Sequence, residues 1–221
     1  MYDDIKYWYL RDHKLFWTLS RSQIKQLCII VGFKKAVKGD VIELANSEAP
    51  RIFLLKKGAI KVVTLTEDGQ EQIKDIIRQG DLFGELELNN SEATHDMAIA
   101  LTNEVSLCSF LLSDFENLLL SHPDLALSYT KFVGLRMRRL RNNYTNLISK
   151  DAKSRLLLFF KEWAEKDGVV RDGRCYIENY LTHADIAQIV CTTRQTVTQL
   201  LNELEAAGLV YYSRKEIILE I

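Results

Sequence analysis

The sequence predicts an α+β protein with a β-rich N-terminal part, one long helix and a small C-terminal helical domain. Turn-forming residues recur every 8 to 11 positions between residues 39 and 81. Residues 124–149 then contain no proline and a single glycine, and two short helical patterns follow one another closely after residue 182. The 221 residues are enough for one large domain or two small ones, each with a proper core.

The N-terminal part is predicted to be β-rich because short runs of β-branched and aliphatic residues lie between the turn signals. The expected strands are 40–45, 51–55, 59–66, 71–77, 97–101 and 105–111. Strands separated by turns at this interval are typical of a sandwich, roll or barrel. Asp68 and Gly69 lie between two such runs and predict a hairpin, because glycine accepts the positive φ of a tight turn. A helical stretch that begins near Ser20 precedes the strands.

A long helix is predicted after the strands. Ser113 and Glu116 have the spacing of a capping box, which predicts a short helix that ends before Pro123. The pattern then stays helical from 124 to about 149, and its apolar residues recur at spacings of 4, 3, 4 and 3. This is the seam of a two-stranded coiled coil, so we expect a homodimer. The expected dimer interface is Val133, Met137, Leu140, Tyr144 and Leu147.

The alternative for this helix is that it packs entirely on its own domain. In either case we expect Tyr129, Phe132 and Leu135, on the other side of the helix, to pack on the β domain. The seam continues beyond these residues, however, and arginines flank it at 136, 138, 139 and 141. The dimer is therefore the favoured interpretation.

Two closely spaced helices are predicted near the C-terminus, after an amphipathic helix over 152–165 and a polar stretch with two glycines. Residues 182–185 cap the first of the two, and a tight connection at 191–193 leads to the second. Each helix has one apolar face, and the small Ala187 allows a close crossing, which is the geometry of a helix-turn-helix.

A β-hairpin is expected after these helices. The apolar runs 209–212 and 217–219 flank a polar tip that contains Arg214 and Lys215. A hairpin in this position is the wing of a winged helix.

Together these parts resemble the Crp/Fnr family of bacterial transcription regulators. The most specific stretch is HADIAQIVCTTRQTVTQLLNELE at 183–205, which is similar to the family's helix-turn-helix signature. A second, GDLFGEL at 80–86, is similar to the start of the family's phosphate-binding cassette. The resemblance implies a sensor domain at 1–122, a double-stranded β-helix or jelly roll of the cyclic-nucleotide-binding type. It further implies a dimerisation helix at 123–150 and a DNA-binding winged helix-turn-helix at 151–221.

The resemblance places the DNA contacts on the second helix of the motif and on the wing. Thr193 matches the family's Ser or Thr at the start of the recognition helix, and Arg194 matches its base-reading arginine, which pairs with guanine O6 and N7. Gln195 and Gln199 replace a glutamate and an arginine of the family. Glutamine pairs with adenine, which allows an operator unlike that of the cAMP receptor. The expected DNA-binding residues are Thr193, Arg194, Gln195, Thr196, Gln199, Arg214 and Lys215.

The family's effector-binding residues are matched less completely in this sequence. The expected effector pocket contains Gly84, Glu85, Leu86 and His95. Glu85 matches the family's ribose-binding glutamate, but the Arg-Ser pair that holds a cyclic phosphate falls on Thr94 and His95, and no arginine occurs between 84 and 112. We therefore expect an effector other than cAMP, or none. The alternative is a cyclic-nucleotide-responsive regulator with altered phosphate contacts.

Composition disfavours several other classes of protein. A formal charge of −1 argues against binding to nucleic acid or membrane through bulk positive charge. No apolar stretch approaches the ~18–20 residues that cross a bilayer, and no signal peptide is evident, so we expect a cytoplasmic protein. The four cysteines include no C-x-x-C pair, and no metal or cofactor is expected.

An enzyme is the weaker alternative. A cupin-like metalloenzyme binds its metal through clustered His and Glu, whereas residues 39–112 contain the single histidine His95. The resemblance implies instead a regulator whose partners are double-stranded DNA, a second copy of the chain, RNA polymerase and an unidentified small-molecule effector.

Overall fold

The computed structural model describes residues 2–43, 50–84 and 96–220, and the chain divides into two compact units, Met1–Arg138 and Arg139–Ile221. Because this division falls inside a helix, the expected domain limits at 122 and 150 stay a prediction. Among the described residues, no helix is both long and apolar enough to cross a membrane.

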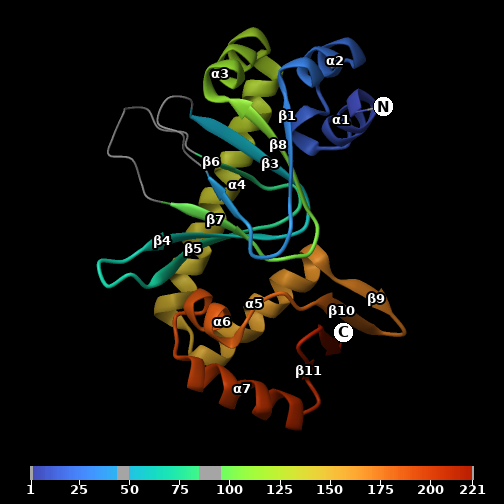
Figure 1. Cartoon of the computed structure of the whole chain (residues 1–221). Coiled ribbons are helices and arrows are strands. Elements are labelled where there is room, and N and C mark those ends of the chain that lie inside the picture. The colour runs from blue at the N-terminus through green and yellow to red at the C-terminus, as the bar shows by residue number, and fades with distance from the viewer. Residues whose placement is uncertain (1, 44–49, 85–95, 221) are drawn as a thin grey trace. The chain divides into compact units, whose positions relative to one another are not determined.

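The first unit contains two antiparallel four-stranded sheets (Figure 1). The first sheet has the order β1-β8-β3-β6, and the second has the order β2-β7-β4-β5. The strands of the first sheet are β1 (Gly32–Ala36), β3 (Arg51–Lys57), β6 (Leu82–Gly84) and β8 (Val105–Leu111). Those of the second are β2 (Val41–Glu43), β4 (Ile60–Leu65), β5 (Glu71–Ile77) and β7 (Met97–Ala100). The predicted β-roll is therefore confirmed, as is the hairpin at Asp68-Gly69, which joins β4 to β5.

The first sheet is buried on both faces, as β3 illustrates. Phe53 and Leu55 join the core between the two sheets, where they pack with residues such as Ile60 of β4. Ile52 and Leu54 point to the other face and join a core formed with the helices of this unit. A strand covered on both faces has a continuous apolar run instead of alternation, which explains the sequence pattern of β3.

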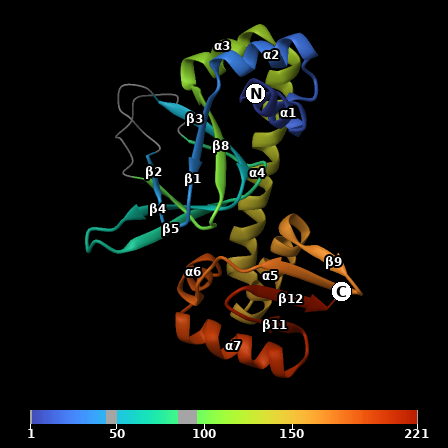
Figure 2. The same ribbon diagram turned by 45° about the vertical axis from the view of Figure 1, so that its right-hand side comes forward.

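The helices of the first unit gather beside its first sheet (Figure 2). They are α1 (Tyr2–Arg11), a short 3-10 helix (Lys14–Phe16), α2 (Arg21–Ile30), α3 (Leu112–Ser121) and the start of α4 (Pro123–Ser149). α2 begins directly after its N-cap Ser20, close to the predicted start, with a capping box between Ser20 and Gln23. α1 and β1 were not predicted from the sequence.

Two expectations for the helices after the strands need correction. The predicted Ser113 capping box is wrong, because α3 begins at Leu112, so that Ser113 lies inside the helix, and Leu111 at the N-cap position makes no side-chain bond. On α4, Tyr129 and Phe132 pack against the helical core as expected. Leu135, by contrast, remains 52% exposed.

The second unit combines three helices with one antiparallel sheet of order β11-β12-β10-β9. After the C-terminal part of α4, its elements are α5 (Ala152–Asp167), β9 (Val169–Arg171), β10 (Arg174–Glu178), α6 (His183–Ile189), α7 (Arg194–Ala206), β11 (Val210–Tyr212) and β12 (Glu216–Glu220). α5, α6, α7 and the β11–β12 wing confirm the sequence prediction. The stretch around Gly168 and Gly173, expected to be merely polar, forms the β9–β10 hairpin.

Candidate DNA-binding interface

The helix-turn-helix is fixed at its start by a reciprocal cap. The Thr182 hydroxyl accepts from the main-chain N–H of Asp185, and the Asp185 carboxylate accepts from the main-chain N–H of Thr182. Two N–H groups that the first turn of α6 leaves without helical partners are thereby satisfied. The cap therefore sets the point at which α6 begins.

A sharp turn joins α6 to α7. Cys191 adopts a positive φ of 52°, and the main-chain N–H of Thr192 donates to the carbonyl of Ala187 at 2.8 Å. Thr193 then caps α7, because its hydroxyl accepts from the main-chain N–H of Thr196 at 3.1 Å. Thr193 is therefore a helix cap as predicted, and its contact with phosphate stays a prediction.

α6 and α7 pack through one apolar face each. Ile186 and Ala187 of α6 are buried, as are Val197, Leu201 and Leu204 of α7. α7 contacts both α6 and β11 of the wing, and Figure 2 shows these elements next to one another. The buried face leaves the opposite side of α7 open to solvent.

The exposed face of α7 carries the predicted base-reading side chains. Arg194, Gln195 and Gln199 are exposed, and Thr196 is half-buried. The Gln199 amide nitrogen donates to the carboxylate of Glu203 at 3.0 Å. The face therefore offers a fork-shaped cation and amides, which are the groups that hydrogen-bond base edges in the major groove.

The wing presents its basic residues on a well-ordered turn. Arg214 and Lys215 are exposed at the tip between β11 and β12. Ser213 closes this tip, because its hydroxyl accepts from the main-chain N–H of Glu216 at 3.0 Å. The Asn179 amide donates to the carbonyl of Ser213 at 2.7 Å and ties the wing to the segment before α6.

His183 connects the motif to the wing, a role that the sequence did not single out. Its ring lies edge-on to Tyr212 with 5.0 Å between centroids, and its Nδ1 lies 2.8 Å from the hydroxyl of Thr198. That hydroxyl donates its proton to the carbonyl of Arg194, so Nδ1 is the donor to Thr198. Burial, and then the charge of Arg194, lower the pKa of His183 and favour the neutral ring.

Arg155, which the sequence also did not reveal, holds the turn between α6 and α7. Its Nε and Nη2 donate to the carbonyl oxygens of Val190 and Cys191 at 2.9 and 3.1 Å. Its Nη1 donates to the carbonyl of Lys150 at 2.5 Å, just after the end of α4. One guanidinium thus ties the start of α5 and the end of α4 to the residues that precede α7.

We expect Arg155→Met to weaken operator binding and to lower the melting temperature. The variant keeps an apolar stem but loses three hydrogen bonds from a charged group, and a hydrogen bond of this kind typically contributes a net ~1.5–3 kcal/mol to stability. Because these bonds are partly exposed, we expect a net loss of about 2 kcal/mol and at least tenfold weaker DNA binding. Circular dichroism and fluorescence anisotropy measure the two effects. Lys161→Met, an exposed change on the same helix, is the control, and equal behaviour of the two variants would contradict the assignment.

The structure covers the expected effector pocket only in part. Gly84 ends β6 with a φ of +117°, and a side chain there would collide with the main chain of Arg51. Glu85, Leu86 and His95 lie outside the described residues. Nearby, the Arg136 guanidinium of α4 donates to the carbonyl of Leu82 at 2.7 Å and pairs with Asp75 at 2.5 Å. Within the described residues, no cluster of His, Cys, Asp or Glu suited to a metal is found.

The predicted dimer seam is open to solvent in the single chain. Met137, Leu140 and Tyr144 expose 61%, 70% and 65% of their surface, and Val133 and Leu147 expose 37% and 43%. These apolar side chains repeat along one side of α4. Their partner stays a prediction.

Comparison with known proteins matches each of the two units to a known domain family. Residues 33–122 match the model of the cyclic nucleotide-binding domain, and residues 154–220 match that of the Crp-like helix-turn-helix domain. The global nitrogen regulator of Synechocystis is 30% identical over 182 residues, which cover 81% of this chain and 80% of that protein. The CRP-like cAMP-activated global transcriptional regulator of Mycobacterium tuberculosis is 24% identical over 82% of this chain and 81% of its own length.

Solved structures show the same fold. A CooA mutant from Carboxydothermus hydrogenoformans superposes with a TM-score of 0.70 at 23% identity, covering 97% of this chain and 94% of its own. FixK2 from Bradyrhizobium japonicum superposes with a TM-score of 0.71 at 20% identity, covering 86% and 92%.

Proposed function

Because this chain belongs to the Crp/Fnr family of transcription regulators, we propose that it binds a pseudo-palindromic operator as a homodimer, with α7 in the major groove. The observation that carries this proposal is the exposed surface of α7, where Arg194, Gln195 and Gln199 are open to solvent while Val197, Leu201 and Leu204 are buried. We further propose that the regulator acts in the cytoplasm and contacts RNA polymerase there.

Affinity for DNA rests on local contacts, because residues 151–221 carry more acidic than basic side chains. Arg194 supplies base contacts, and Arg214 and Lys215 supply phosphate contacts from the wing. A dimer doubles these contacts and matches the two-fold symmetry of a palindromic site.

Selection of bound sequences from random DNA tests this function. We expect an enriched palindrome whose half-site centres lie about 10 base pairs, or one helical turn, apart. Recovery of no palindrome, or of a single asymmetric site, would contradict symmetric reading by two copies of α7.

We propose that cAMP is not the effector. Its phosphate carries a full negative charge, which is costly to bury without a partner. The family's arginine supplies that partner through two charge-assisted hydrogen bonds, and here Thr94 and His95 take the place of the Arg-Ser pair. Removal of one partner of a buried charge pair costs about 3–5 kcal/mol, enough to turn micromolar into millimolar affinity.

Calorimetry with cAMP at pH 7.5 should therefore show no saturable binding below about 1 mM. The cAMP-activated relative from Mycobacterium tuberculosis serves as the positive control under the same conditions. A micromolar dissociation constant, or a rise in operator affinity with cAMP, would favour the alternative of a regulator with altered phosphate contacts.

A further inference from the structure

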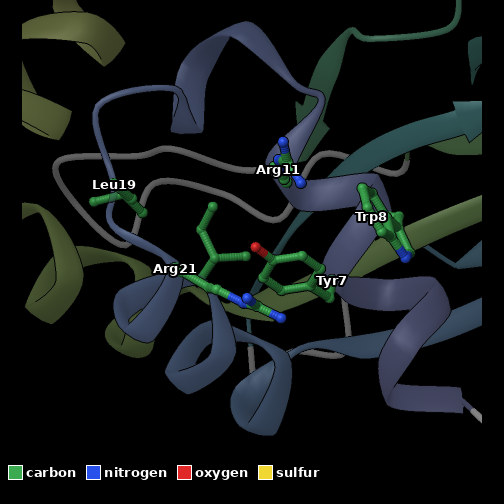
Figure 3. Close-up of a pocket in the computed structure, with 6 residues that line it drawn as sticks. Tyr7, Trp8, Arg11, Leu19 and Arg21 are labelled. Atoms are coloured by element: carbon green, nitrogen blue, oxygen red, sulfur yellow. The ribbon is translucent and has the colours of Figure 1, made fainter.

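A cavity of about 430 Å³ that is open to solvent lies between α1 and α2 (Figure 3). Its lining residues are Tyr7, Trp8, Arg11, Leu19, Arg21 and Ile24. A volume of this size suits a small organic molecule.

The cavity combines two cations with aromatic and aliphatic surface. The Arg11 guanidinium lies 5.0 Å from the centre of the Trp8 ring, and the Arg21 guanidinium lies 5.9 Å from that of Tyr7. Figure 3 shows the side chains of Arg21 and Tyr7 next to each other. In the described part of the chain, the three cation–π contacts all use consecutive aromatic residues of α1, since Tyr9 makes the third with Lys56.

The described lining of this cavity carries two positive charges. None of the lining residues whose side chains the structure describes is acidic, and Arg11 and Arg21 form no ion pair with a described side chain. A guanidinium that contacts a ring through its face keeps its N–H groups available in its own plane. Two such groups beside a cavity favour an anion, because carboxylates and phosphates accept paired hydrogen bonds from arginine.

The remaining lining residues are apolar or aromatic, and they determine which uncharged group of a ligand fits the cavity. Leu19, Ile24 and the rings of Tyr7 and Trp8 offer apolar surface for a flat hydrocarbon group. We propose that this cavity is a second small-molecule site of the regulator, which takes an aromatic anion and bridges α1 to α2. The two guanidinium charges attract the acid head, and the ring lies against the aromatic and aliphatic residues.

Calorimetry on the full-length protein with 2-naphthoate as the probe tests this site. We expect saturable binding of one molecule per chain, with a dissociation constant below 1 mM. Arg11→Gln and Arg21→Gln should each weaken binding at least tenfold, because each removes one cation and leaves the apolar surface in place. Lys25→Gln, an exposed change on α2 outside the cavity lining, should bind as the unmodified protein does.

Two further ligands test the chemistry of the head group. The neutral 2-naphthalenemethanol should not bind saturably, since it has the same ring system without the charge. 1-Naphthyl phosphate, compared with 2-naphthoate, distinguishes a phosphate-selective from a carboxylate-selective site, and preferential binding of either anion supports the proposal. It would be overturned by equal binding of the neutral alcohol, by unchanged affinity in the arginine variants, or by no binding of either anion up to 1 mM.

Discussion

Leu140→Arg is expected to convert the dimer to monomers and to abolish tight operator binding. Leu140 is 70% exposed in the single chain and lies at the middle of the apolar seam of α4. In the proposed dimer its counterpart faces it, so the change places two like charges at one buried contact. Loss of a buried leucine side chain alone costs about 2–5 kcal/mol, and an unpaired buried charge adds to that cost.

Sedimentation velocity at micromolar concentration measures this effect, with one chain weighing 25.5 kDa. Asn142→Arg is the matched control, because Asn142 is exposed on α4 and is not one of the seam residues. It adds the same charge and should leave the dimer intact. Operator affinity should fall at least 100-fold in Leu140→Arg only, since a monomer occupies one half-site. A dimeric Leu140→Arg protein would show that the seam is misassigned.

The helix-turn-helix could be predicted in detail because local chemistry determines it. Thr182 and Thr193 are cap residues whose hydroxyls satisfy helix N-termini, and the structure uses both in that way. The apolar spacing of α7 likewise predicts its buried residues, including Val197 and Leu204. Signals of this kind depend on neighbours in the sequence, so they can be recognised without knowledge of the tertiary structure.

Elements that depend on distant partners were missed. β1 (Gly32–Ala36) has exposed lysines at its centre and exists because it pairs with β8 over five residues. The β9–β10 hairpin did have a local signal, because Asp172 and Gly173 adopt the positive φ values of a tight hairpin turn. The Ser113 capping box is the reverse case, in which a local signal was present but misleading: the spacing of Ser113 and Glu116 matched the motif, yet the helix begins before Ser113.

The sequence predicted the exposed residues of the candidate site but not the residues that hold its helices in place. Arg194 and Lys215 follow from the resemblance, which assigns them to DNA contacts, and both are exposed in the structure. Arg155 and His183 act mainly through contacts with residues 15 to 36 positions away in the chain. No pattern in one sequence reveals such a contact, because it arises only when the helices pack.

Arg194→Ala is expected to weaken the operator complex by about 1–3 kcal/mol per half-site and to relax discrimination at one base pair in each. The side chain is exposed at the first turn of α7, and its fork matches O6 and N7 of guanine. Alanine keeps the helix but removes both donors. In a two-fold complex the losses add, so the total affinity should fall by roughly 30-fold to 10⁴-fold.

A substitution in the wing provides the comparison that tests whether Arg194 contacts bases. Lys215→Ala removes a tip cation, so it should weaken binding to all sequences alike and reduce the dependence of affinity on salt. Arg194→Ala should instead lose affinity for the selected operator while binding to unrelated DNA changes little. Fluorescence anisotropy with both DNAs at several salt concentrations separates a base contact from a phosphate contact. If Arg194→Ala lowers both affinities equally, Arg194 binds the backbone, and the glutamines of α7 are left to read the sequence.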